Sequence, residues 1–201
     1  MATKEDILEQ LVEEYLLHQG YFVRHNVKYL PKRDHADFVS NQDSNHSDID
    51  VIGYHPSLSG VSRVLVVSCK SWQGGFNPAV ELKHIQDKKI VRGREAWKSF
   101  RELVIPKWSD AFVSAVVSAT GQSEFTYVLA VTKVVGDKTL WETNPEFIQA
   151  INGNPLRILD LREMLNAISP VLSTTLAGTE VGRMLQLFKA AGINITSKDA
   201  L

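Results

Sequence analysis

This sequence has a single cysteine, almost no net charge and no long apolar run. The single cysteine in 201 residues, Cys69, excludes an internal disulfide and argues against a structural zinc site, since such sites need several thiolate or imidazole ligands. No segment approaches the roughly 18 apolar residues of a membrane span. The first residues, MATKEDILEQ, contain no apolar signal-peptide core. We therefore expect a soluble, cytoplasmic protein without a membrane partner.

The low net charge conceals one basic segment. The formal net charge of −1 at pH 7 is unfavourable for a protein that binds a polyanion, because phosphate contacts require lysine and arginine. Between Lys83 and Lys107, however, eight basic residues are opposed by only three acidic ones. This segment is a candidate phosphate-binding surface. A solvated helix face with ordinary charges is the alternative interpretation.

Hydrophobic periodicity and turn residues predict an α/β domain. The expected elements are a helix at 5–19, strands at 21–29, 49–54 and 61–69, helical sequence from Pro78 that breaks at 105–108 and continues to 119, strands at 125–135 and 156–159, and helices at 160–168 and 179–191. This order implies a mixed central sheet of four or five strands flanked by helices. We assign residues 1–170 to the main domain and 171–201 to a helical extension packed on it, which is also a possible homodimer surface.

Polar residues at one tip of two neighbouring strands suggest a chemical site. Because side chains alternate along a strand, Asp48 and Asp50 share one face of SDIDVIGY, while Ser68 and Lys70 share one face of VLVVSCK. If the strands form a hairpin, a carboxylate and an ammonium converge. A hard divalent cation prefers oxygen ligands, and a nearby lysine can orient or deprotonate a water and offset phosphate charge. Asp50 and Lys70 together therefore meet the minimal needs of phosphodiester hydrolysis.

These segments resemble the PD-(D/E)XK nuclease superfamily, which includes many type II restriction enzymes, Mrr-like restriction proteins and Holliday junction resolvases. The resemblance spans roughly residues 5–135. Its parts are the helix LEQLVEEYLLHQGYFV, the strand SDIDVIGY and the segment VVSCKSW, in the place of the (D/E)XK strand. It implies a restriction endonuclease-like αβββαβ core, with Glu9, Asp50 and Lys70 at the functional positions of the family.

One position departs from the pattern of the family. The second acidic residue of the motif is replaced by Ser68, as in SXK variants that take the missing carboxylate from the following helix. Glu81 lies eleven residues after Lys70, near the start of that helix, whose N-cap and first residue we assign to Asn77 and Pro78. By resemblance, Mg²⁺ or Mn²⁺ is held by Asp50, the Cys69 carbonyl and Glu81 or Glu9, with Lys70 positioning the water.

Each candidate residue also has a purely structural interpretation. Asp48 and Asp50 can simply polarise a strand end, and Lys70 can extend its charge to solvent over an apolar stem. Glu81 suits a helix N-terminus for its dipole alone, Ser68 can be a small residue that makes room, and Glu9 can be a solvated helix residue. Glu14 is expected at the surface. His35, Asp37, Asp43 and His46 lie in the polar loop 31–47, but their spacing matches no reliable metal-ligand pattern.

The expected partner is DNA. The candidate nucleic-acid-binding residues are Lys83, Lys88, Lys89, Arg92, Arg94 and Trp72, the last either by base stacking or, equally, as a residue packed against the following helix. The resemblance implies a magnesium-dependent endodeoxyribonuclease. The alternatives are a nuclease-like domain that has lost catalysis and only binds nucleic acid, and an interaction protein whose basic helix meets an acidic partner.

Overall fold

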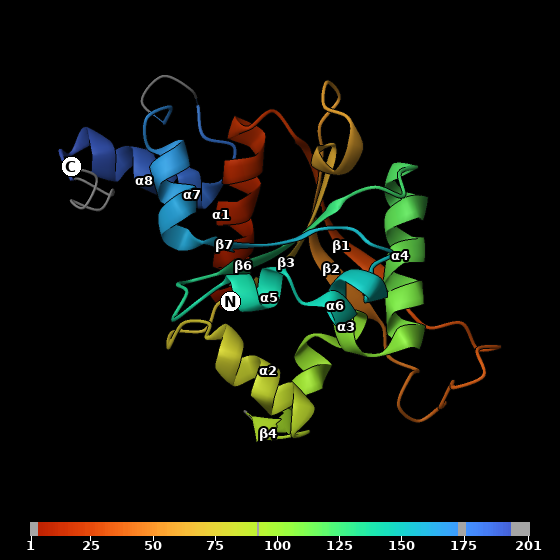
Figure 1. Ribbon diagram of the computed structural model, residues 1–201. Coiled ribbons are helices and arrows are strands. Elements are labelled where there is room, and N and C mark those ends of the chain that lie inside the picture. The colour runs from red at the N-terminus through yellow and green to blue at the C-terminus, as the bar shows by residue number, and fades with distance from the viewer. Residues whose placement is uncertain (1–3, 92, 173–175, 194–201) are drawn as a thin grey trace.

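The computed structural model describes residues 4–91, 93–172 and 176–193, and it contains a central five-stranded sheet (Figure 1). The strand order is β1-β2-β3-β6-β7. These strands are β1 (Phe22–Tyr29), β2 (Ser47–Tyr54), β3 (Val64–Lys70), β6 (Thr126–Val131) and β7 (Leu156–Asp160). The pairs β1–β2 and β2–β3 are antiparallel, whereas β3–β6 and β6–β7 are parallel. The prediction of an α/β fold with a mixed sheet is confirmed.

Helices cover both faces of the sheet. The helices are α1 (Lys4–His18), α2 (Pro78–Gln86), α3 (Arg101–Val104), α4 (Pro106–Thr120), α5 (Thr139–Glu142), α6 (Pro145–Ala150), α7 (Leu161–Ile168) and α8 (Glu180–Ala190). Helices α1, α7 and α8 lie on one face, and α2 to α6 lie on the other (Figure 1). None of the helices in the described ranges has both the length and the apolar composition needed to cross a membrane.

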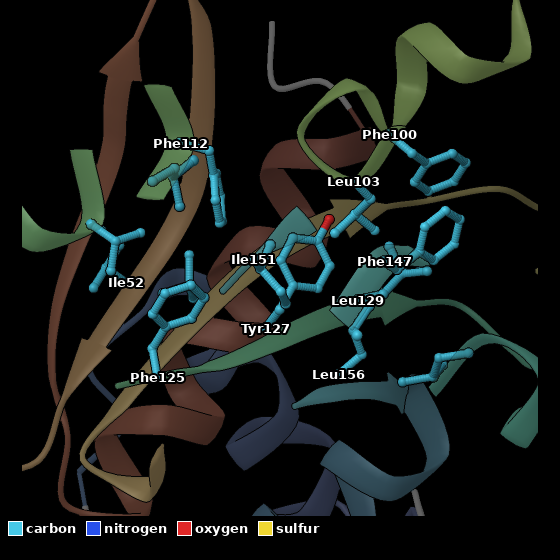
Figure 2. Packing of buried hydrophobic residues seen from close by; sticks show 14 of the residues in the cluster. Ile52, Phe100, Leu103, Phe112, Phe125, Tyr127, Leu129, Phe147, Ile151 and Leu156 are labelled. Atoms are coloured by element: carbon cyan, nitrogen blue, oxygen red, sulfur yellow. The ribbon is translucent and has the colours of Figure 1, made fainter. Parts of the chain in front are cut away.

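Strands β3 and β6 are buried on both faces, as the nearly continuous apolar sequence of β3 predicts. Val66 and Tyr127 belong to the core beneath α2 to α6, while Val67 and Val128 belong to the core beneath α1 and α7. Figure 2 shows Tyr127 among aromatic and aliphatic side chains of the first core, with its hydroxyl directed toward Leu103 in α3. The sheet therefore acts as a rigid platform whose strand ends hold polar groups.

The prediction of helical sequence from Pro78 to residue 105 is wrong in its second half. Asn77 does cap α2, since its side chain accepts a hydrogen bond from the Val80 N–H. The helix ends at Gln86, however, and Lys88 then adopts a left-handed conformation with φ of 49°. A short hairpin of β4 (Ile90–Val91) and β5 (Arg94–Glu95), a 3₁₀ turn η2 (Ala96–Ser99) and α3 follow. The reversal redirects the basic segment back toward the sheet.

Helix α8 packs against α1. Val181 and Leu185 of α8 are buried in the same core as Leu11 of α1. Residues 1–3 and 194–201, at the two ends of the predicted domain ranges, lie outside the described residues. Glu14 of α1, expected at the surface, is instead fully buried and accepts hydrogen bonds from the backbone and hydroxyl of Thr179, the N-cap of α8. The sequence offered no sign of this partner, which is 165 residues distant.

Candidate active site

Strands β2 and β3 separate at Asp50. Their pairing stops at Val51↔Val67, and the Asp50 Oδ2 atom then lies 2.6 Å from the backbone nitrogen of Cys69, which donates a hydrogen bond to it. The Asp50 carboxylate thus takes the place of the backbone carbonyl that would accept this hydrogen bond if the two strands continued to pair. β2 remains paired with β1, and β3 remains paired with β6 up to Lys70↔Val131, so each strand follows its outer neighbour. The carboxylate of Asp50 is fixed in the fork between them.

The ammonium of Lys70 is held at the same end of β3. Its Nζ atom donates hydrogen bonds to the Ser68 hydroxyl, at 2.9 Å, and to the Cys69 carbonyl, at 3.2 Å. An ammonium carries three N–H groups, so these two contacts do not exhaust its donors. The Ser68 hydroxyl therefore positions Lys70.

A polar cavity of about 260 Å³ opens at the fork. Asp50, Ser68, Cys69 and Lys70, which the sequence places at one edge of the sheet, all line it. The carboxylates in its lining are Asp48, Asp50 and Glu102. The geometry thus brings Asp50 and Lys70 to one solvent-accessible space, with oxygen donors suited to a hard cation and an ammonium suited to a phosphate.

Three basic side chains also line this cavity. Arg94, Lys98 and Arg101 line it from the segment that runs from β5 to α3. The guanidinium of Arg101 lies 4.5 Å from the ring centroid of Trp108, which restricts its position through a cation–π contact. Lys98 forms an ion pair with Glu95 at 3.1 Å, but both side chains are exposed, so this pair is weak. These three residues are the basic wall.

Glu102 is a cavity residue that the sequence analysis missed. Only 5% of its surface is exposed, and its Oε1 and Oε2 atoms accept hydrogen bonds from the hydroxyls of Tyr127, at 2.7 Å, and Tyr29, at 3.3 Å. Burial raises the pKa of both tyrosines well above the ordinary value, and the carboxylate of Glu102 acts in the same direction. Both hydroxyls therefore stay protonated and donate. The only signal in the sequence was a glutamate directly before the apolar run LVI.

Glu81 and Glu9 are placed differently. Glu81 is buried in α2, and its carboxylate lies 3.6 Å from Nδ1 of His84. Glu9 is half-buried in α1, on the face of the sheet opposite α3. Among the residues that the structure describes, neither belongs to the lining of the cavity that contains Asp50 and Lys70.

The predicted nucleic-acid-binding residues fall into two groups. Lys83, Lys88 and Lys89 are exposed on α2 and just after it, whereas Arg94 lines the cavity. Trp72 is half-buried and packs against the core, with its ring 6.0 Å from the ring of Phe76 and 6.0 Å from that of Phe100. Arg92 lies outside the described residues.

Within the described ranges, no group of three or more histidine, cysteine, aspartate or glutamate side chains is arranged to hold a metal ion by itself. Mg²⁺ does not require such a group, because it is commonly held by one or two carboxylates together with water and substrate phosphate. Asp50 and the Cys69 carbonyl fit this donor chemistry. Comparison with known proteins found no matching family model, no matching curated protein and no matching solved structure.

Proposed function

We propose that this protein is a magnesium-dependent endonuclease that hydrolyses DNA phosphodiester bonds at the fork between β2 and β3. The supporting observation is that Asp50 and Lys70, from two different strands, line one cavity beside the Cys69 carbonyl. The sequence resemblance to PD-(D/E)XK nucleases supports the same assignment. A bound divalent cation polarises the phosphate and lowers the pKa of a bound water.

The residues of the chain would divide the remaining work. Asp50 and the Cys69 carbonyl hold the cation, and Lys70 orients the attacking water and offsets negative charge on the phosphate. The water oxygen forms a bond to phosphorus while the bond from phosphorus to the 3′ oxygen breaks. The products are a 5′-phosphate and a 3′-hydroxyl, which takes up one proton of the water.

The basic wall favours a polyanionic substrate. Arg94, Lys98 and Arg101 line the same cavity as Asp50 and Lys70. Positive charge next to a site for phosphate cleavage concentrates phosphate backbones and orients them before reaction. A homodimer that cuts both strands is the arrangement implied by the resemblance.

The deciding experiment is plasmid nicking with Mg²⁺ or Mn²⁺ by wild type, Asp50→Asn and Lys70→Ala, with Arg162→Gln as a surface control on α7. We expect relaxed plasmid from wild type and from the control, and a loss of at least about a hundredfold in both site variants, the scale that general acid–base groups contribute. Equal nicking by wild type and Lys70→Ala would contradict the assignment.

The second candidate is a nuclease-like domain that binds DNA without cutting it. Ser68, which supplies no carboxylate at the motif position, favours this alternative. Isothermal titration of wild type and Asp50→Asn with Mn²⁺ separates the two functions. In an active nuclease, the substitution Asp50→Asn weakens Mn²⁺ binding. In a domain that only binds DNA, the substitution leaves Mn²⁺ binding unchanged, and the DNA affinity still depends on salt.

A further inference from the structure

The carboxylate of Glu102 bridges two strands that are not neighbours. Tyr29 belongs to β1 and Tyr127 to β6, and the sheet order places β2 and β3 between them. Because one carboxylate accepts hydrogen bonds from both hydroxyls, it must lie over β2 and β3. Asp50 and Lys70 belong to these two strands, and all three side chains line the same cavity.

The burial of the Glu102 carboxylate carries a cost in free energy. Burial of a carboxylate is unfavourable, and glutamate is rarely buried unless it is paired or hydrogen-bonded. The two tyrosine hydroxyls offset part of this cost, but each carboxylate oxygen offers two lone pairs. Each carboxylate oxygen of Glu102 accepts one of these two hydrogen bonds, which leaves acceptor capacity on a side chain whose orientation is already fixed.

We propose that Glu102 supplies the second carboxylate of the cation site, in place of the residue that the family motif would have at Ser68. This inference rests on the proposed function, because it concerns the same cation. It differs from the assignment by sequence resemblance, which points to Glu81. Glu81 lies against His84 in α2, whereas Glu102 lines the cavity with Asp50.

The consequence is a site assembled from three segments far apart in the chain. β2 provides Asp50, β3 provides the Cys69 carbonyl and Lys70, and α3 provides Glu102. Two carboxylates and one carbonyl suit Mg²⁺ or Mn²⁺, which complete their coordination with water and substrate phosphate. Tyr29 and Tyr127 act as positioning residues that orient Glu102.

The test compares Glu102→Gln with Glu81→Gln, a matched neutralisation of another buried glutamate. Isothermal titration with Mn²⁺ is performed without DNA, and thermal unfolding is measured in EDTA to show that each variant is folded. We expect Glu102→Gln to weaken Mn²⁺ binding by about tenfold or more, because the loss of a residue that merely orients a metal ligand already weakens binding by about that much. The Mn²⁺ affinity of Glu81→Gln should stay close to that of wild type. Unchanged affinity in Glu102→Gln overturns the inference, as does a loss in Glu81→Gln that equals or exceeds it.

A wild-type measurement covers the case in which Glu102→Gln fails to fold. Fe²⁺ with ascorbate and peroxide generates hydroxyl radicals at the bound ion and cleaves the nearby backbone. Cleavage is expected around residues 50, 69 and 102. If the backbone is cleaved around residues 50 and 69 and also in α2 near residue 81, but not in α3, the inference is overturned. Plasmid nicking that requires Asp50 but not Glu102 would leave the nuclease proposal intact, whereas no nicking by wild type defeats that proposal separately.

Discussion

The carboxylate of Asp50 accepts a hydrogen bond from the backbone N–H of Cys69 at 2.6 Å, at the point where β2 and β3 cease to pair. Asp50 therefore has a structural role in addition to the chemical role that we propose for it. The two roles can be separated by substitution, because asparagine retains an acceptor for the N–H but lacks the negative charge.

We expect Asp50→Asn to lose nicking activity with little loss of stability, and Asp50→Ala to lose both. Cys69 is buried, so alanine at position 50 leaves its N–H without this acceptor, at a cost of about 1–3 kcal/mol. For a domain of this size each 1 kcal/mol corresponds to roughly 2–4 °C in Tm. Thermal unfolding in EDTA and plasmid nicking measure the two effects. Plasmid nicking by Asp50→Asn at the wild-type rate would show that the negative charge of Asp50 has no chemical role.

The basic wall should determine how DNA binding depends on salt. Arg94→Gln combined with Lys98→Gln is expected to weaken binding to a labelled duplex and to lower the slope of log K against log salt by about two, since each phosphate contact contributes close to one unit. Fluorescence anisotropy over a KCl series provides the slope. The control is Arg162→Gln, an exposed arginine on α7. If Arg162→Gln lowers the slope of log K against log salt by as much per removed charge as the double variant does, DNA binding is diffuse and not localised at the cavity.

The loop 31–46 should detach from α4 at low pH. Asp43 is 2% exposed and accepts hydrogen bonds from Lys107 Nζ, at 2.6 Å, and Trp108 Nε1, at 3.2 Å. Burial alone would raise the pKa of Asp43, but these hydrogen bonds and one from the Val39 N–H outweigh it, so the pKa lies below its ordinary value. The stabilisation is thus complete above the unfolded pKa of about 3.9 and is lost as the pH falls through the lower, folded pKa.

Substitution of Asp43 should remove this pH dependence. We expect Asp43→Asn to lower the free energy of unfolding near pH 7 by about 1–3 kcal/mol, because the half-buried Lys107 loses its counter-charge. Urea denaturation between pH 2.5 and 7 measures the difference between variant and wild type. That difference should shrink as the pH falls below about 4. A difference that stays constant with pH would show that Asp43 is not the group that titrates.

The packing of α8 on α1 should tolerate no side chain at Gly182. A Cβ atom there would lie 2.4 Å from the Glu14 Oε2 atom, which accepts hydrogen bonds from Thr179. We expect Gly182→Ala to destabilise the protein by about 1–3 kcal/mol, as overpacking does, despite the higher helix propensity of alanine. Gly74→Ala is the matched control, because its Cβ meets nothing within 4 Å. Thermal unfolding that ranks the two variants equally would contradict the contact with Glu14.

Local patterns in the sequence were sufficient for the five strands of the sheet, for α1 and for two residues of the candidate site. Alternation and apolar runs identified the strands that carry Asp50 and Lys70, and the apolar stripe of residues 5–19 identified α1, because both signals depend on neighbours in the chain. The helix expected up to residue 105 failed for a local reason too, since Lys88 adopts a left-handed conformation that no pattern of apolar residues reveals.

The tertiary structure alone decided which charged groups meet. Hydrogen bonds to Tyr29 and Tyr127, which lie 73 and 25 residues away along the chain, hold Glu102 at the cavity. Glu14 is buried against Thr179, which lies 165 residues away. Hydrogen bonds between such distant residues depend on how helices dock on the sheet, which leaves no periodic trace in sequence. The sequence by itself determined the strands and the pair Asp50 and Lys70, whereas the packing of α3 and α8 determined which carboxylates are buried and which face the cavity.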